Sequence, residues 1–100
     1  MIRSTLELRA APGRREELLR RLDLVETLAS RRAEPGYLGT EIQLPFDDED
    51  AVVVWTAWAS KEHFERWLEG NDPALLLVDV KDLVAGRPRL RLFRVIDTIE

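Results

Sequence analysis

The stretch AVVVWTAWASKEHFERWLEG, residues 51–70, changes its hydrophobic period near its middle, and this change decides the fold. Up to Ala59 every residue except Thr56 is apolar, which is typical of a β-strand that is covered on both faces. Beyond Ser60, a residue type that caps helices well, apolar residues recur at helical spacing. The stretch therefore predicts a buried strand over 51–59 that leads directly into a short amphipathic helix over 61–70.

Two segments before this stretch alternate between apolar and polar residues, as a strand with one buried face does. The first is IRSTLELRA, residues 2–10, and the second is GYLGTEIQL, residues 36–44. In the second segment strict alternation places Tyr37 on the face opposite Leu38 and Thr40. Both segments are predicted strands.

The remaining segments predict two helices and a last strand. Residues 14–33 carry leucine and valine at helical spacing, which indicates a long helix between the first two strands. Residues 74–86, ALLLVDVKDLVAG, predict a second short helix that Gly86 and Pro88 bring to an end. Residues 89–99, RLRLFRVIDTI, are predicted to be the final strand.

The loop PFDDED, residues 45–50, places four acidic residues between two predicted strands. Such a cluster could hold a calcium ion, but it lacks the spaced ligands and the glycine of a calcium-binding loop. We interpret it as the acidic tip of a hairpin.

The predicted order is β-α-β-β-α(α)-β, which is the split βαβ pattern of the ferredoxin-like fold in the α+β class. It predicts one domain over residues 1–100, with a four-stranded antiparallel sheet and helices on one face. The strand at 51–59 is apolar on both faces, however, so its second face also needs a cover. We expect a second copy of the chain to supply it, as a homodimer in which two sheets pack into a dimeric α+β barrel.

Composition excludes several classes of function. The net charge of −4, from 15 basic and 19 acidic residues, argues against a nucleic-acid partner. The chain has no cysteine and a single histidine, so thiolate chemistry and a multi-histidine metal site within one chain are excluded, and we expect no metal. No apolar run approaches the ~20 residues of a membrane span, and no signal peptide is recognisable, so we expect a cytoplasmic protein without a membrane partner.

The candidate site lies where the predicted strand meets the predicted helix. All three tryptophans and the only histidine fall within residues 55–67, either as the core of the fold or as the wall of a pocket. Trp55 and Trp58 point to opposite faces of the strand, and the sequence leaves open which of them faces the pocket. The Trp58 indole N–H could donate a hydrogen bond to a substrate oxygen, and His63 is of the residue type best suited to act as a general base near neutral pH.

These properties make Trp58 and His63 the candidate catalytic residues. Phe64 and Trp67 are candidates for substrate binding because helical spacing places them on the same face as His63. Tyr37 is a further candidate for substrate binding as a polar side chain.

Two segments, EPGYLGTEIQ at 34–43 and VVVWTAWASKEHFERWL at 52–68, resemble the antibiotic biosynthesis monooxygenase family of dimeric α+β barrels. The resemblance follows the order of elements over nearly the whole chain. It implies a dimeric barrel and a function within a diverse family, which includes cofactor-free monooxygenases of aromatic polyketide pathways, haem-degrading enzymes and quinol oxygenases. The matching features are Pro35-Gly36, Trp58, Ser60, Phe64 and Trp67-Leu68.

Two branches of the family can be compared residue by residue. Trp67 is similar to the tryptophan that ruffles haem in the haem-degrading members. The positions of their asparagine and of their iron-ligating histidine correspond here to Leu6 and Leu77, which disfavours haem degradation. Trp58 resembles the tryptophan that ends the third strand of the actinorhodin-pathway monooxygenase, whereas Phe64 and Val54 stand in place of its tyrosine and asparagine.

Cofactor-free oxygenation, one of the activities that the resemblance implies, asks little of the protein. A phenol or enol is deprotonated and supplies the electrons itself, so the protein needs only a dry pocket, a base and a polar anchor. We therefore expect a monooxygenase-like protein acting on an aromatic or polyketide-type small molecule without a cofactor. The alternative is a non-catalytic dimeric barrel that binds a small apolar ligand.

Overall fold

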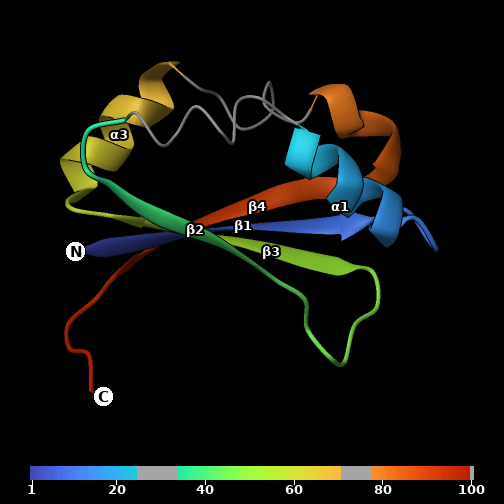
Figure 1. The fold of residues 1–100 in the computed structure, drawn as a ribbon, viewed down its shortest axis with the longest axis horizontal. Helices are drawn as coiled ribbons and strands as arrows, with labels where there is room; N and C mark the ends of the chain where they lie inside the picture. The colour runs from blue at the N-terminus through green and yellow to red at the C-terminus, as the bar shows by residue number, and fades with distance from the viewer. Residues whose placement is uncertain (25–33, 71–77, 100) are drawn as a thin grey trace.

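A computed structural model describes residues 1–24, 34–70 and 78–99, and the helices in this part of the chain lie on one side of an antiparallel sheet (Figure 1). The strand order is β2-β3-β1-β4. The predicted α+β ferredoxin-like fold is therefore confirmed. The elements are β1 (Ile2–Ala10), α1 (Arg15–Leu24), β2 (Tyr37–Gln43), β3 (Ala51–Trp58), α3 (Lys61–Gly70), the 3₁₀ helix η2 (Val78–Leu83) and β4 (Val84–Arg94).

Most predicted elements occur where the hydrophobic pattern placed them. The predicted strand at 2–10 and the predicted helix at 61–70 match β1 and α3 residue for residue. The predicted helix at 14–33 is confirmed as far as Leu24, and its part at 25–33 lies outside the described residues.

The prediction for the last third of the chain is partly wrong. Residues 84–86 belong to strand β4 and not to a helix, and β4 ends at Arg94 instead of continuing to residue 99. The strand begins early because Val84 pairs with Ala10 at the far end of β1, and a register shift absorbs the extra length. Gly86 adopts a left-handed φ of 72°, and Pro88 is tolerated because β4 is an edge strand.

The face of Tyr37 is also predicted wrongly. Tyr37 pairs with Trp58 and Gly39 pairs with the adjacent Ala57, so β2 has a bulge between them. The bulge places Tyr37 on the same face as Thr40, and the two side chains are hydrogen-bonded with a Tyr37 Oη to Thr40 Oγ1 distance of 2.6 Å. Strict alternation cannot reveal such an insertion, because one extra residue inverts every assignment before it.

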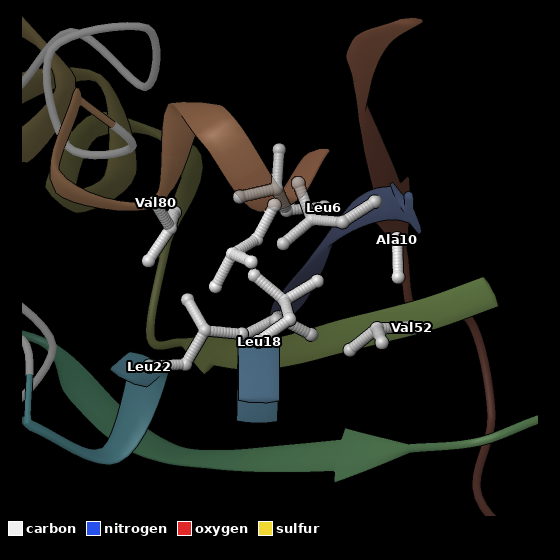
Figure 2. Packing of buried hydrophobic residues seen from close by; sticks show 9 residues of the cluster. Leu6, Ala10, Leu18, Leu22, Val52 and Val80 are labelled. Carbon is white, nitrogen blue, oxygen red and sulfur yellow. The ribbon is translucent and has the colours of Figure 1, made fainter. Parts of the chain in front are cut away.

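Two hydrophobic clusters lie between the sheet and the helices. The first, here called the aliphatic half, packs under α1 and η2 (Figure 2), and the second, the aromatic half, packs under α3. The aliphatic half consists of Leu6, Leu8, Ala10, Leu18, Leu22, Val52, Val54, Val80 and Leu83. The aromatic half consists of Ile2, Trp58, Phe64 and Trp67, with Tyr37 and Leu68 packed against it.

The opposite face of the sheet carries no helix in the described part of the chain (Figure 1). Along β3 buried residues alternate with half-buried ones, and the half-buried set on this open face is Ala51, Val53, Trp55 and Ala57. Trp55 stacks on Phe93 of β4 with ring centroids 6.0 Å apart. The sequence therefore identified correctly that Trp55 and Trp58 point to opposite faces.

Candidate functional site

The aromatic half brings together four of the five predicted site residues. Trp58, at the end of β3, is 1% exposed, and its ring lies 5.7 Å from that of Tyr37 and 5.7 Å from that of Trp67. Phe64 meets it edge-on at 6.1 Å. Aromatic pairs at these separations stabilise one another beyond their burial, so the cluster holds Trp58 in one orientation.

The indole Nε1 of Trp58 is buried and has no hydrogen-bond partner among the described residues. Burying an amide-like donor without a partner costs roughly 1–3 kcal/mol, so native proteins rarely retain one. A donor kept unpaired inside an otherwise apolar cluster has the chemistry to bind a ligand oxygen that reaches it. This is the feature of the cluster that packing alone does not explain.

A row of hydroxyl groups borders the aromatic half on the helix side of the sheet. Ser4 of β1 pairs with Thr56 of β3, which in turn pairs with Thr40 of β2. Ser4 and Thr56 are buried, the Thr40 and Thr56 oxygens are 3.4 Å apart, and the Tyr37 hydroxyl extends the row. This hydroxyl row lies between the Trp58 position and the aliphatic half.

The sequence analysis did not select the hydroxyl row. Its members come from three different strands, so only the register of the sheet makes them neighbours. A signal was nevertheless present, because Ser4 and Thr56 interrupt otherwise apolar faces of their strands. Buried polar residues at such positions are more informative than the apolar residues around them.

His63 lies in the first turn of α3 and is held by two neighbours. Its Nδ1 lies 2.7 Å from Ser60 Oγ, and its backbone N–H donates to the same oxygen at 3.3 Å, so Ser60 caps the helix as predicted. The ring also lies directly against the backbone of Gly36, where an added Cβ would be 2.3 Å from His63 Cγ. His63 is therefore fixed in position, and it is half-buried.

The acceptor to which the Ser60 hydroxyl donates its hydrogen bond decides which ring nitrogen of His63 carries the proton. Hydrogen bonds from its own backbone N–H and from the Ser60 hydroxyl hold the pKa of Glu62 below its ordinary value. When the Ser60 hydroxyl donates to Glu62, its oxygen accepts the Nδ1–H of His63, and Nε2 is left as a proton acceptor. When the hydroxyl donates to Nδ1 instead, Nε2 carries the proton.

Two open cavities lie elsewhere. One, of about 240 Å³, lies on the open face and is lined by Arg3, Gly39, Trp55 and Ala57 among others. The second, of about 550 Å³, lies beside the β2–β3 hairpin and is lined by residues that include Arg9. Neither of these two cavities is lined by any of the five predicted site residues.

Two other features of the described residues bear on partners and ligands. No three histidine, aspartate or glutamate side chains among them are grouped as metal ligands. Within the same residues, no helix has the length and the apolar character that crossing a bilayer requires.

Comparisons with known proteins agree with this architecture. The sequence profile of the family described as "Antibiotic biosynthesis monooxygenase" matches residues 1–72. Comparison with curated proteins finds no match.

Solved structures resemble the chain over nearly its full length. The haem-degrader MhuD from Mycobacterium tuberculosis, solved with two haems bound in its active site, is 23% identical, with a TM-score of 0.76 and 100% of both chains covered. The cofactor-independent oxygenase SnoaB from Streptomyces nogalater is 18% identical, with a TM-score of 0.70, 98% of this chain and 95% of that chain covered. A Nitrosomonas europaea protein of unknown function is 21% identical, with a TM-score of 0.74, 99% of this chain and 92% of that chain covered. At these identities the likeness establishes the fold.

Proposed function

We propose that this chain, which belongs to the antibiotic biosynthesis monooxygenase family, oxygenates an aromatic or polyketide-type small molecule without a metal or organic cofactor. The observation that carries the proposal is the buried, unpartnered indole N–H of Trp58. Trp58 and His63 are the proposed catalytic groups. Phe64, Trp67 and Tyr37 are the proposed substrate-binding groups.

The reaction would draw its electrons from the substrate. Removing a proton from an anthrone gives an electron-rich anion, which transfers one electron to dioxygen and leaves a radical pair. The pair recombines, and loss of water leaves a quinone, so that one dioxygen is consumed for each quinone and each water formed. A protein accelerates these steps by orienting the substrate, excluding bulk water and stabilising the developing anion.

Two residues have the properties that these steps need. The Trp58 indole N–H would donate to the substrate oxygen that becomes negatively charged. His63 would accept the proton at Nε2 while its Nδ1–H donates to Ser60 Oγ. The hydroxyl row offers further donors and acceptors for oxygens at the other end of a polyketide-type substrate.

A second candidate is a non-catalytic barrel that binds a small apolar ligand. Leu6 and Val54 pair with each other, and both belong to the aliphatic half. Leu6 corresponds to an asparagine of the haem-degrading members, and Val54 corresponds to an asparagine of the actinorhodin-pathway monooxygenase. This chain therefore has an apolar side chain at both positions where the compared proteins have a polar one. An apolar ligand would suit that surface better than a substrate that needs its oxygen held.

We also propose that the functional unit is a homodimer, because the open face of the sheet exposes part of an apolar strand. Trp55 and Val53 lie there half-buried and without a covering helix in the described residues. A second copy packed sheet to sheet would cover them. The cytoplasm stays the predicted location.

Oxygen uptake with dithranol as the probe tests the enzyme proposal. The purified protein should accelerate uptake over buffer, and both Trp58→Phe and His63→Ala should lower the rate at least about tenfold. For His63 this threshold is below the roughly 10²–10⁴-fold that general acid–base catalysis contributes. Trp55→Phe is the matched control, because it makes the same substitution on the open face and should retain the wild-type rate.

Three outcomes would contradict the enzyme proposal in different ways. A rate that falls equally in Trp55→Phe would mean that the loss is structural. Dithranol binding without accelerated uptake would favour the binding barrel. A haem titration that shifts the haem absorbance at one equivalent would favour haem as the ligand. Haem would then bind although Leu6 replaces the asparagine of the haem-degrading members.

A further inference from the structure

Three oxidisable rings of the aromatic half form a chain from the interior to the surface. The ring of Trp58 lies 5.7 Å from that of Trp67 and 5.7 Å from that of Tyr37. Both tryptophans are buried, whereas Tyr37 is half-buried. Phe64 also contacts Trp58, but a phenyl ring is not oxidised under conditions that oxidise indole or phenol. Among the described residues, Tyr37 is therefore the oxidisable ring that connects Trp58 with solvent.

The composition of the chain makes indole and phenol its main one-electron donors. The side chain that most readily gives up an electron or a hydrogen atom is that of cysteine, and the sequence contains none. It contains three tryptophans and a single tyrosine. Because that tyrosine is the one that contacts Trp58, an electron can reach an oxidised Trp58 from the only phenol of the chain in one step.

The hydrogen-bond environment of Trp58 makes its oxidised form unstable. An indole that has lost one electron becomes a strong acid, and it is stabilised when the N–H proton can leave to an acceptor. The Nε1 of Trp58 is buried, and no acceptor for it lies in the described part of the chain. An oxidised Trp58 therefore keeps its proton and remains a strong oxidant.

Tyr37 has the acceptor that Trp58 lacks. A phenol gives up its hydroxyl proton when it loses one electron, so its oxidation requires a proton acceptor at the oxygen. The Tyr37 hydroxyl lies 2.6 Å from Thr40 Oγ1, which is 3.4 Å from Thr56 Oγ1. A threonine hydroxyl can accept one proton while it releases another, and Thr40 is exposed to water. Electron loss is therefore easier to sustain at Tyr37 than at Trp58.

We propose that the aromatic half is an electron relay in which Tyr37 reduces an oxidised Trp58 and Thr40 takes up the phenolic proton. One electron passes from the Tyr37 ring to the Trp58 ring, which returns to neutral indole. The phenolic proton moves to Thr40 Oγ1 as Thr40 releases its own proton to water, and Tyr37 becomes a neutral phenoxyl radical. A small reductant in solution, such as a thiol or an enediol, then supplies one electron, water supplies the proton, and the phenol is restored.

The relay would protect the proposed site from its own chemistry. The proposed reaction passes through a substrate radical and reduced dioxygen beside Trp58, and a radical that escapes recombination can take an electron from this indole. An indole radical that is not reduced is destroyed by further oxidation. In this role the inference rests on the proposed function, whereas the relay itself needs only an oxidised Trp58.

Laser flash photolysis of the purified chain tests the relay without any substrate. Light that is absorbed by indole but not by phenol ejects an electron from the tryptophans, and the tryptophanyl and tyrosyl radicals are followed by their separate absorption bands. In the wild type a tyrosyl radical should form as the tryptophanyl signal decays, at a rate independent of protein concentration. It can only be the radical of Tyr37, because the chain has one tyrosine.

Two tryptophan variants identify the ring that passes on the oxidation. Trp58→Phe should abolish the formation of the tyrosyl radical within the chain, because it removes the indole that contacts Tyr37. Trp55→Phe is the matched control and should retain this step, since Trp55 lies on the opposite face of the sheet and stacks on Phe93.

Two milder variants keep the test decisive if Trp58→Phe does not fold. Tyr37→Phe removes the electron donor and should lengthen the lifetime of the tryptophanyl radical. Thr40→Val removes the proton acceptor at similar shape, so the tyrosyl radical should form at least about threefold more slowly, which is the rate equivalent of one hydrogen bond. Thr40→Ser restores a hydroxyl and should recover most of the wild-type rate.

Separate results would contradict the relay and the proposed function. The absence of a tyrosyl radical in the wild type, or an unchanged rate of its formation in Trp58→Phe, would overturn the relay. Equal rates in the wild type and Thr40→Val would overturn the role of Thr40 as the proton acceptor. A tyrosyl radical that forms as expected in a protein without oxygen uptake on dithranol would leave the relay in place and count against the proposed function alone.

Discussion

The two halves of the helix layer lie on the same sheet but differ in their chemistry. The aliphatic half consists of alanine, valine and leucine side chains, which have no polar atom to satisfy. The aromatic half holds an indole N–H without a partner and is bordered by hydroxyl groups. Apolar packing stabilises both halves, but only the aromatic half keeps polar groups that packing does not require. We infer that the first half mainly stabilises the fold and the second carries the function.

The largest expected effect is a loss of stability in the aliphatic half. Leu18 is fully buried between α1 and the sheet, so Leu18→Ala should lower the free energy of unfolding by about 2–5 kcal/mol through lost burial and the cavity left behind. Urea denaturation measures this. Leu44→Ala, the same change at an exposed position, should cost less than about 0.5 kcal/mol.

The division of roles would fail if Leu18→Ala also abolished oxygen uptake at a temperature where the variant is fully folded. It would equally fail if the variant were as stable as Leu44→Ala. Either result would mean that the two halves are not separable.

A smaller effect is expected at Gly36, where the aromatic half meets the chain that enters β2. Gly36 has a φ of 80°, and an alanine there would push its Cβ into His63. Gly36→Ala should cost about 2–3 kcal/mol, of which about 1–2 kcal/mol is backbone strain. It should also slow oxygen uptake, because the His63 ring must move.

Gly13→Ala separates strain from contact. Gly13 has a similar φ of 74°, but an added Cβ would have nothing within 4 Å. This variant should show the strain alone, at about 1–2 kcal/mol, with unchanged oxygen uptake. Equal stability losses at Gly36 and Gly13 would show that the His63 contact is readily relieved, and would weaken the argument that His63 is fixed in position.

The smallest effect is expected from acid at the hairpin that adjoins the aliphatic half. Asp48 accepts two hydrogen bonds from Arg9, at 3.2 and 2.5 Å, and this interaction holds the pKa of the carboxyl below its ordinary value. A lowered folded-state pKa adds stability above the unfolded pKa, which is about 4, and this stability is lost as the pH falls through the folded pKa. The gain is small because the pair is exposed.

Thermal unfolding between pH 2 and pH 7 measures this effect. The wild type should unfold at a slightly higher temperature than Asp48→Asn at neutral pH, and the difference should vanish towards pH 2. Oxygen uptake at neutral pH should be equal in both proteins. A difference that grows on acidification would contradict the assigned sign.

The elements that could be predicted from sequence are those whose hydrophobic pattern fits only one type of secondary structure. Strand β3 has too many apolar residues for a surface element. After it, the capping residue Ser60 and the helical spacing of Phe64 and Trp67 are compatible only with a helix. Residues 84–86 could not be assigned this way, because a short apolar run fits a helix or a strand until its partner is known. That partner is the far end of β1, more than seventy residues earlier.

The candidate site was predictable in its residues but not in its polar groups. Trp58, Phe64 and Trp67 are close in sequence and share the strand–helix junction, so their contact follows from local structure. The hydroxyl row depends on the register of three strands, and the side of Tyr37 depends on a bulge. The unpaired state of the Trp58 N–H depends on packing around one atom, which no periodic pattern encodes.

Pro88, in the edge strand β4, has a consequence for the life of a newly made subunit. A bare sheet edge is a template for adding strands from other molecules, and such growth leads to fibres. Proline has no amide hydrogen to offer, and the bulge in the adjoining ladder twists this edge away from a flat template. We therefore expect β4 to be a poor template for strand addition from other molecules, so that a newly made chain is less prone to aggregate at this edge.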